Sequence, residues 1–165
     1  MTQCDEYIYR AINKQPIVFV MCGYPASGKS YFAKNTLMKD VYRHRVYISS
    51  DEIREEICGD VGDQSKNQEV FQLFYKRARK AVKEGKDVVL DATHLTRRSR
   101  RNCLQRFKDL NCKIIAVQMT TSAEKAIRRN NKRNRVVPSY AMERMINAFE
   151  PVSKDEGFDE IRKVK

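Results

Sequence analysis

Four short runs of β-branched and apolar residues recur along the chain. They occupy residues 17–22, 45–51, 87–93 and 113–119. The first has no polar alternation, which is typical of a central parallel strand that is covered on both faces. The four runs therefore predict a sheet of about four strands.

Between these runs, apolar residues recur at helical spacing. The clearest case is the stretch from Asn67 to Lys83, which keeps an apolar stripe and is closed by Gly85. Further helices are predicted over residues 29–40, from residue 52, and over 97–110, 122–134 and 138–148. Strands that alternate with helices indicate an α/β fold, in which a parallel sheet has helices on both faces. We expect a single domain over residues 1–165, with its core at about 16–150.

The stretch GYPASGKS, residues 23–30, lies between the first strand and the first helix. It matches the phosphate-binding P-loop pattern, in which backbone N–H groups and a helix N-terminus surround phosphate groups. We expect Gly23 and Gly28 to let the backbone approach the phosphates, Lys29 to bridge the β- and γ-phosphates, and Ser30 to bind Mg²⁺. The predicted ATP site also includes Ala26, Ser27 and Tyr31. The motif places the chain among P-loop NTPase folds of the adenylate-kinase-like type.

Two aspartates lie at the carboxyl ends of predicted strands: Asp51 after VYISS and Asp91 after DVVL. Ligands lie at the carboxyl ends of the strands in open parallel sheets, so both carboxylates are expected beside the P-loop. There they can accept a hydroxyl proton or hold Mg²⁺ and its waters. The alternative is that one of them only caps its following helix. Arg54 shares a helical face with Asp51 and is a candidate for binding a substrate phosphate, or else a surface arginine that pairs with Glu55 or another neighbour.

Positive charge is the strongest compositional signal. The chain carries 33 Lys and Arg against 21 Asp and Glu, a net charge of +12. This balance favours a nucleic-acid partner, although a soluble basic surface with an ATP site is the plainer interpretation. Arg129 and Arg133 are four residues apart, which predicts a basic helical lid over the P-loop. Four further arginines are candidates for following a nucleic-acid backbone: Arg97, Arg98, Arg100 and Arg101.

Cysteine spacing and hydropathy bear on the compartment. The five cysteines form no pattern of a zinc site, and their odd number favours reduced thiols. No apolar run approaches the length of about 20 residues that spans a membrane, and no secretory leader is recognisable. We therefore expect a cytoplasmic protein without membrane contact.

In order and spacing, several motifs resemble the polynucleotide 5′-hydroxyl kinase family, which includes the kinase domain of the T-even bacteriophage enzyme and bacterial end-healing kinases. They are GYPASGKS, SSDEIR, LDATHL and RRNNKR followed by VVP, and the resemblance covers about residues 16–150. His94 departs from the asparagine that is frequent after D-x-T in that family, and no D-x-D-G-T phosphatase signature is present.

The resemblance implies transfer of the γ-phosphoryl group of ATP to a 5′-hydroxyl end of DNA or RNA. At matching positions, Asp51 would be the general base and Arg54 would bind the phosphate of the adjacent nucleotide. Asp91 and Thr93, with Arg97 beyond them, would belong to the acceptor site. Arg133 would contact the ATP phosphates and Arg129 would lie near the adenine.

Two other functions stay open at this point. One is a P-loop kinase of a small acceptor, such as a sugar, an antibiotic or, as in zeta toxins, a nucleotide sugar; such an enzyme does not need arginine-rich helices around its acceptor site. The other is a nucleic-acid-binding module that uses ATP only as a switch, which leaves the pairing of Asp51 with Arg54 unexplained.

Overall fold

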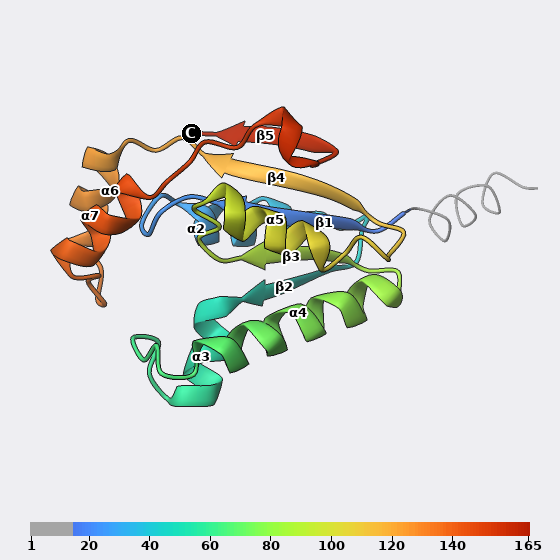
Figure 1. Ribbon diagram of the computed structural model, residues 1–165, viewed down its shortest axis with the longest axis horizontal. Coiled ribbons are helices and arrows are strands. Elements are labelled where there is room, and N and C mark those ends of the chain that lie inside the picture. Colours follow the sequence, from blue (N-terminus) through green and yellow to red (C-terminus); the bar gives the residue numbers. More distant parts are fainter. Residues whose placement is uncertain (1–14) are drawn as a thin grey trace, which may run out of the picture.

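Five parallel strands form one sheet in the order β2-β3-β1-β4-β5 (Figure 1). The computed structural model describes residues 15–165. The strands are β1 (Ile17–Cys22), β2 (Arg45–Ser49), β3 (Asp87–Asp91), β4 (Lys113–Met119) and β5 (Glu160–Val164). Parallel neighbours need a crossover connection, and the α/β alternation of the sequence supplies one between each successive pair of the first four strands.

Helices cover both faces of this sheet, as the apolar periodicity predicts. They are α2 (Lys29–Asn35), α3 (Ser50–Cys58), α4 (Asn67–Lys83), α5 (Arg97–Gln105), α6 (Ala123–Asn130) and α7 (Ser139–Asn147), with 3₁₀ turns at Leu37–Lys39 and Lys154–Glu156. Helix α4 has the predicted bounds. Helix α7 agrees within one residue at each end, whereas α2, α5 and α6 end four or five residues before their predicted limits, since turn residues and caps decide where a helix stops.

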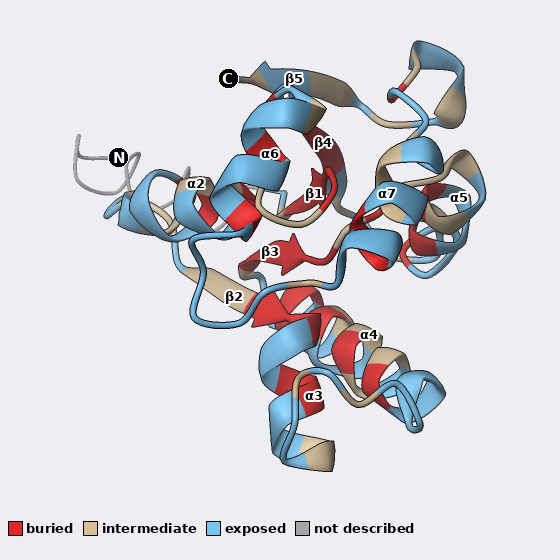
Figure 2. Ribbon diagram, turned by 90° about the vertical axis from the view of Figure 1, so that its left-hand side faces the viewer, coloured by how far each residue is buried: buried red, intermediate tan, exposed pale blue. Residues whose placement is uncertain are grey.

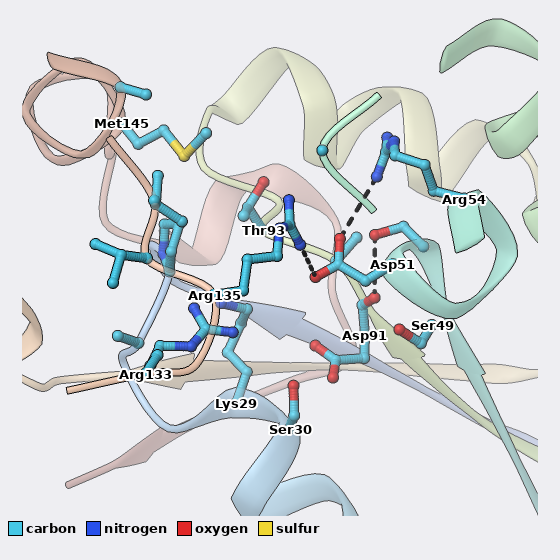
Figure 3. A pocket seen from close by; sticks show the side chains of 18 of the residues that line it. Lys29, Ser30, Ser49, Asp51, Arg54, Asp91, Thr93, Arg133, Arg135 and Met145 are labelled. Atoms are coloured by element: carbon cyan, nitrogen blue, oxygen red, sulfur yellow. Dashed lines mark hydrogen bonds and ion pairs between the residues drawn. The ribbon is translucent and has the colours of Figure 1, made fainter. Parts of the chain in front are cut away.

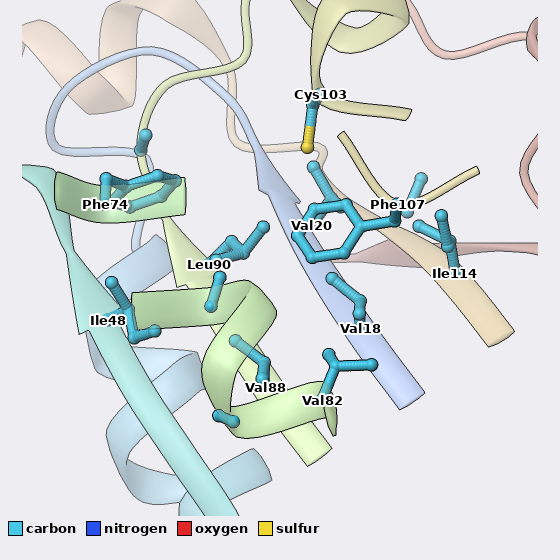
Figure 4. Close-up of a cluster of buried hydrophobic side chains, with 14 of the residues drawn as sticks. Val18, Val20, Ile48, Phe74, Val82, Val88, Leu90, Cys103, Phe107 and Ile114 are labelled. Carbon is cyan, nitrogen blue, oxygen red and sulfur yellow. The ribbon is translucent and has the colours of Figure 1, made fainter. Parts of the chain in front are cut away.

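Side-chain alternation along β1 divides the core into two layers. Val18 and Val20 pack with residues of α4 and α5 such as Phe74 and Cys103 (Figure 4). Phe19 and Met21 point to the opposite face, where they pack with α2 and its following turn. Because both faces are buried, the strand is apolar throughout, as its sequence predicts.

The fifth strand corrects the expectation of about four. Residues 160–164 pair in parallel with β4, from Ile115 opposite Glu160 to Met119 opposite Val164. Their sequence, EIRKV, is charged and only partly buried, so it carries little of the apolar signal that marks the inner strands. An edge strand of this kind is defined by its partner more than by its own composition.

All five strands run toward one edge of the sheet, where α3, α6 and α7 gather (Figures 1 and 2). Ligands of open parallel sheets bind where the carboxyl ends of the strands meet, so this edge is the place to look for a binding site.

Among residues 15–165, no helix combines the length and the apolar character that a membrane span requires.

Candidate active site

The P-loop connects β1 to α2 through a backbone that depends on glycine. Gly23 and Gly28 have φ angles of 153° and 99°, which disfavour residues with a side chain. A Cβ atom at Gly23 would lie 2.8 Å from the Ser27 hydroxyl oxygen. Gly28 is the N-cap of α2 and offers no side chain to the first turn, so the N–H groups there remain directed at the loop interior.

Two hydrogen bonds join this loop to neighbouring strand ends. The Gly23 amide donates to the carbonyl of Thr93, which lies beyond β3 (2.9 Å), and the hydroxyl of Thr121, which lies beyond β4, donates to the Ser27 carbonyl (2.8 Å). The loop is therefore held from both sides. Its shape does not depend on the loop's own bonds alone.

Lys29 lies at the start of α2 and is almost fully buried, at 8% exposure. Its ammonium donates to the Tyr24 carbonyl at 3.0 Å. Burial lowers the pKa of Lys29, and the nearby carboxylates of Asp91 and Asp51 act in the opposite direction. A buried ammonium with one neutral acceptor and nearby carboxylates has free capacity for anionic oxygens.

Asp51 is the second residue of α3, and its side chain is 59% exposed. The cap of α3 is Ser49, whose hydroxyl accepts the Glu52 amide at 3.3 Å. Asp51 therefore does not act as the helix cap, which was one interpretation of the sequence. Its carboxylate lies in the cleft, facing the basic side chains of the opposite wall (Figure 3).

Arg54 lies three residues after Asp51 and is only 5% exposed. Its guanidinium contacts an Asp51 carboxylate oxygen at 3.4 Å and donates to the Asn67 side-chain carbonyl at 2.6 Å. Its Nε atom is buried without a hydrogen-bond partner among the described residues. Arg54 is thus not the surface arginine of the plainer interpretation; it is a buried cation that borders the cleft.

Asp91, at the end of β3, lies beside Lys29 and Ser30 (Figure 3). The Tyr47 hydroxyl donates to its carboxylate at 2.5 Å. Burial, with Asp91 next in importance, raises the pKa of Tyr47, so the phenol stays protonated as a donor. Asp91 does not cap α5, because Thr96 and Ser99 form that capping box. Its carboxylate is fixed by Tyr47 and remains turned toward the P-loop.

The basic segment after β4 differs from the predicted long helix. Helix α6 ends at Asn130, whose side-chain amide pairs with both backbone groups of Val137, at 2.9 and 3.0 Å. These bonds close the loop of residues 131–136. Arg129 and Arg133 therefore do not lie on one helical face, yet both line the cleft, and so does Arg135, which lies 4.0 Å from Asp51.

The arginines of α5 lie elsewhere. Arg97 does not line the cleft; its guanidinium pairs with Asp155 and donates to the Ser153 hydroxyl. Arg100 is fully buried and forms a bidentate pair with Glu156, at 2.7 and 2.8 Å. Neither side chain is placed to follow a nucleic-acid backbone through the cleft. Only Arg98 and Arg101 of this group are exposed.

His94 is a buried structural side chain. Its Nδ1 atom bonds to the Met21 carbonyl at 2.8 Å, and burial lowers the pKa of His94 to about 4. The backbone at His94 has a φ of 42°, the left-handed conformation. A neutral imidazole that is buried against β1 does not exchange protons with the cleft near neutral pH.

The cleft has a volume of about 1050 Å³, the upper end of the size range of ligand pockets. Most of the predicted site residues line it: Ala26, Gly28, Lys29, Ser30, Tyr31, Asp51, Arg54, Asp91, Thr93, Arg129 and Arg133. Gly23 and Ser27 support it from within the loop. The sequence did not single out Tyr47, Asn67, Tyr140 or Arg144. Tyr47 lies in the middle of a predicted strand, where an aromatic residue gives no sign of a site, and the other three lie on helices whose cleft-facing side depends on the fold.

The arrangement of strand, P-loop and helix within a parallel sheet defines a P-loop kinase fold. A sequence model of the AAA domain family (AAA_33) matches residues 18–152, and the chain belongs to that family. A comparison with curated proteins finds no match.

Solved structures share the fold at low identity. A chain of the Pnkp1/Rnl/Hen1 RNA repair complex is similar at a TM-score of 0.73 and 19% identity, over 82% of this chain and 44% of the other. The present chain therefore spans less than half of that relative. A putative kinase from Chloroflexus aurantiacus (0.69, 13%, covering 92% and 88%) and a gluconokinase from Sinorhizobium meliloti (0.57, 15%, covering 92% and 83%) are also similar.

Proposed function

We propose that the protein is an ATP-dependent polynucleotide 5′-kinase, which transfers the γ-phosphoryl group of ATP to a 5′-hydroxyl end of DNA or RNA. The observation that carries this proposal is the pairing of Asp51 with Arg54 in the cleft beside the P-loop. It places an exposed carboxylate, suited to a general base, next to a buried guanidinium, suited to a phosphate. An acceptor that presents a hydroxyl and a neighbouring phosphate fits both groups.

The donor half of the site is suited to ATP. The P-loop backbone and Lys29 would hold the β- and γ-phosphates. Arg133 would contact the transferring phosphoryl group, and Arg129 would border the adenine, as the resemblance implies; both line the cleft. Cations placed at the transferring group stabilise the charge that is spread over its oxygens in the transition state.

The oxygen atoms beside the P-loop fit Mg²⁺. The Ser30 hydroxyl and the Asp91 carboxylate lie together there (Figure 3). Among residues 15–165, no cluster of three or more His, Cys, Asp or Glu side chains could hold a metal by itself. Mg²⁺ in kinases is usually held by one or two side chains, with phosphates and waters completing its shell. When bound, it would neutralise phosphate charge.

The proposed reaction is a single displacement. Asp51 accepts the proton of the 5′-hydroxyl, whose oxygen forms a bond to the γ-phosphorus, while the bond from that phosphorus to the β–γ bridging oxygen breaks and ADP leaves. Arg54 would hold the phosphate on the 3′ side of the reacting nucleoside and so fix the position of the hydroxyl. The 3.4 Å contact between Arg54 and Asp51 holds the general base next to the site that would bind this phosphate.

Charge around the cleft favours a polyanionic acceptor. Arg54, Arg135 and Arg144 line it in addition to the two arginines assigned to the donor. One similar structure is described as part of an RNA repair complex, which is consistent with a nucleic-acid acceptor here.

A small-molecule acceptor is the second candidate. Gln64, Asn67 and Thr93 line the same cleft and offer amide and hydroxyl groups of the kind that bind sugars. A similar structure is described as a gluconokinase. This candidate assigns Arg54 to a carboxylate or phosphate of the small molecule.

The decisive experiment is incubation of the purified protein with γ-labelled ATP, Mg²⁺ and 5′-hydroxyl DNA or RNA oligonucleotides, with sugars and gluconate in parallel. We expect label on the 5′ end, none with Lys29→Ala, and loss of transfer but not of ATP binding with Asp51→Ala. Label on a sugar alone would favour the second candidate. Label released only as phosphate would indicate an ATP switch.

A further inference from the structure

Helix α7 presents a stripe of four side chains to the cleft. Tyr140, Ala141, Arg144 and Met145 all line it, and their spacing of one and four residues places them on one helical face. The stripe combines an aromatic ring, an apolar floor and a cation. No part of the proposed phosphoryl transfer uses it.

Packing on another side of α7 fixes the direction of this stripe. Met142 is 2% exposed and packs with Tyr24 and Ala126, and Ile146, one turn later, packs against the same cluster. The Tyr24 and Phe149 rings meet edge to face at 5.7 Å. The helix is thus anchored to the P-loop and to α6, and the cleft-facing stripe is held in place before any ligand arrives.

Two members of the stripe lack partners within residues 15–165. Tyr140 is 72% exposed, and no hydrogen bond or aromatic contact engages its ring or hydroxyl there. Arg144 is exposed and has no acidic side chain within 4.0 Å among these residues. An aromatic face and a cation one helical turn apart are the two groups that bind a base and a phosphate of single-stranded nucleic acid.

We propose that the Tyr140–Arg144 face of α7 is a subsite for the second nucleotide of the acceptor strand, with the base stacked on Tyr140 and a backbone phosphate on Arg144. This inference rests on the proposed polynucleotide kinase activity. It predicts that the protein prefers a substrate whose 5′ end is single-stranded, because a base that is paired in a duplex does not offer its face to a side chain.

Exposure along the stripe places this subsite outside the reacting one. Ala141 is 8% exposed and lies deep in the cleft, whereas Tyr140 lies at its rim. The nucleoside that presents its hydroxyl to Asp51 must lie in the deep part. The rim is then left for the next nucleotide along the strand.

The test is a double-mutant cycle between protein and substrate. The KM of the wild type and of Tyr140→Ala is measured with a 5′-hydroxyl oligonucleotide and with the same oligonucleotide abasic at its second position. Removal of the ring or of the base should each raise KM about 5- to 100-fold, and removal of both should raise it no further. A nucleoside 3′-monophosphate, which has no second nucleotide, should show the same KM with both proteins.

The proposed contact of Arg144 with a phosphate is tested by measuring KM at different ionic strengths. Arg144→Gln should raise the oligonucleotide KM more at low than at high ionic strength, whereas Lys108→Gln, at an exposed basic residue outside the cleft, should leave it unchanged. Tyr42→Ala, a 77% exposed tyrosine outside the cleft, is the control for Tyr140→Ala.

Two failures are distinguishable. If the wild type labels oligonucleotides but the effects of Tyr140→Ala and the abasic position multiply independently, or Tyr140→Ala has no effect, the subsite is refuted and the kinase activity stands. If the wild type labels no polynucleotide, the proposed function itself fails, and this subsite fails with it.

Discussion

Two arginine-rich runs look alike in the sequence and differ completely in the folded protein. The run of α5 consists of Arg97, Arg98, Arg100 and Arg101, and the run after β4 consists of Arg128, Arg129, Lys132, Arg133 and Arg135. In the first run, Arg100 is fully buried on Glu156 and Arg97 pairs with Asp155. In the second, three arginines line the cleft, and their only acidic contact within residues 15–165 is that of Arg135 with Asp51 at 4.0 Å.

Positive charge is therefore available to a ligand only where the fold does not neutralise it. Arg100 makes its remaining bonds to backbone carbonyls at His94, Leu95 and Pro151, so it joins the loop after β3 to the C-terminal segment. Burial with a full set of acceptors makes this arginine structural. The arginines after β4 are exposed and have no comparable set of partners in the part of the chain that the structure describes.

The largest expected effect comes from the run after β4. Arg133→Ala should lower kcat of the proposed kinase by about 1,000-fold or more, because an arginine on the transferring phosphoryl group stabilises charge that develops there. The melting temperature should not change, since the side chain is exposed. Steady-state kinetics and thermal unfolding would check both. Arg128→Ala, on the adjacent α6 and outside the cleft, is the matched control, and equal losses in the two variants would refute a specific role.

The next effect comes from the α5 run and concerns stability. Arg100→Met leaves the Glu156 carboxylate buried without its partner, which should cost about 3–5 kcal/mol in the free energy of unfolding. Replacing both residues, as Arg100→Met with Glu156→Leu, should recover much of that loss. Urea unfolding of the two variants measures this. A double variant no more stable than the single one would show that the ion pair is not the cause.

Low pH should remove the stability that the Arg100–Glu156 ion pair contributes. Burial alone would raise the pKa of Glu156, but the Arg100 hydrogen bonds and the Ser153 amide outweigh it and hold the pKa below its ordinary value. The stabilisation is therefore complete above the unfolded pKa, about 4.3, and is lost as pH falls through the lower folded value. Glu156→Gln should be less stable than the wild type near pH 7, with a smaller gap below about pH 4. A constant gap in urea midpoints would contradict this.

The smallest effect is expected at Arg97. Its pair with Asp155 is exposed, so Arg97→Ala should change the free energy of unfolding by no more than about 1 kcal/mol. Its guanidinium points toward the C-terminal segment, so the KM for a polynucleotide should stay unchanged. Kinetics at low salt provide the measurement. A raised KM would return Arg97 to the acceptor site that the resemblance assigns to it.

The parts of the site that follow from local pattern were predictable from the sequence. The P-loop spacing and the rule that ligands lie at strand ends predict that Lys29, Ser30, Asp51 and Asp91 lie in one cleft, and all four line it. Four strands and the bounds of α4 followed from apolar periodicity.

Long-range pairing was not predictable in the same way. Glu156 lies 56 residues from Arg100, and no local pattern connects them. Tyr47 lies in the middle of β2, and only the pairing of β2 with β3 brings it to Asp91. The end of α6 depends on a side-chain bond from Asn130 to Val137, which competes with helix continuation.

The hydrogen bonds and the ion pair that join residues 95–100 to residues 150–156 have a consequence for synthesis on the ribosome. A nascent chain that has reached residue 149 already carries the P-loop, Asp51 and every arginine of the cleft. It still lacks Glu150, which bonds to Leu95 and Arg97, and Glu156, the partner of Arg100. Until that segment emerges and docks, Arg100 lacks its Glu156 partner and the loop after β3 lacks its bonds to Glu150, so we expect the cleft to become fully ordered only after residue 156 has emerged.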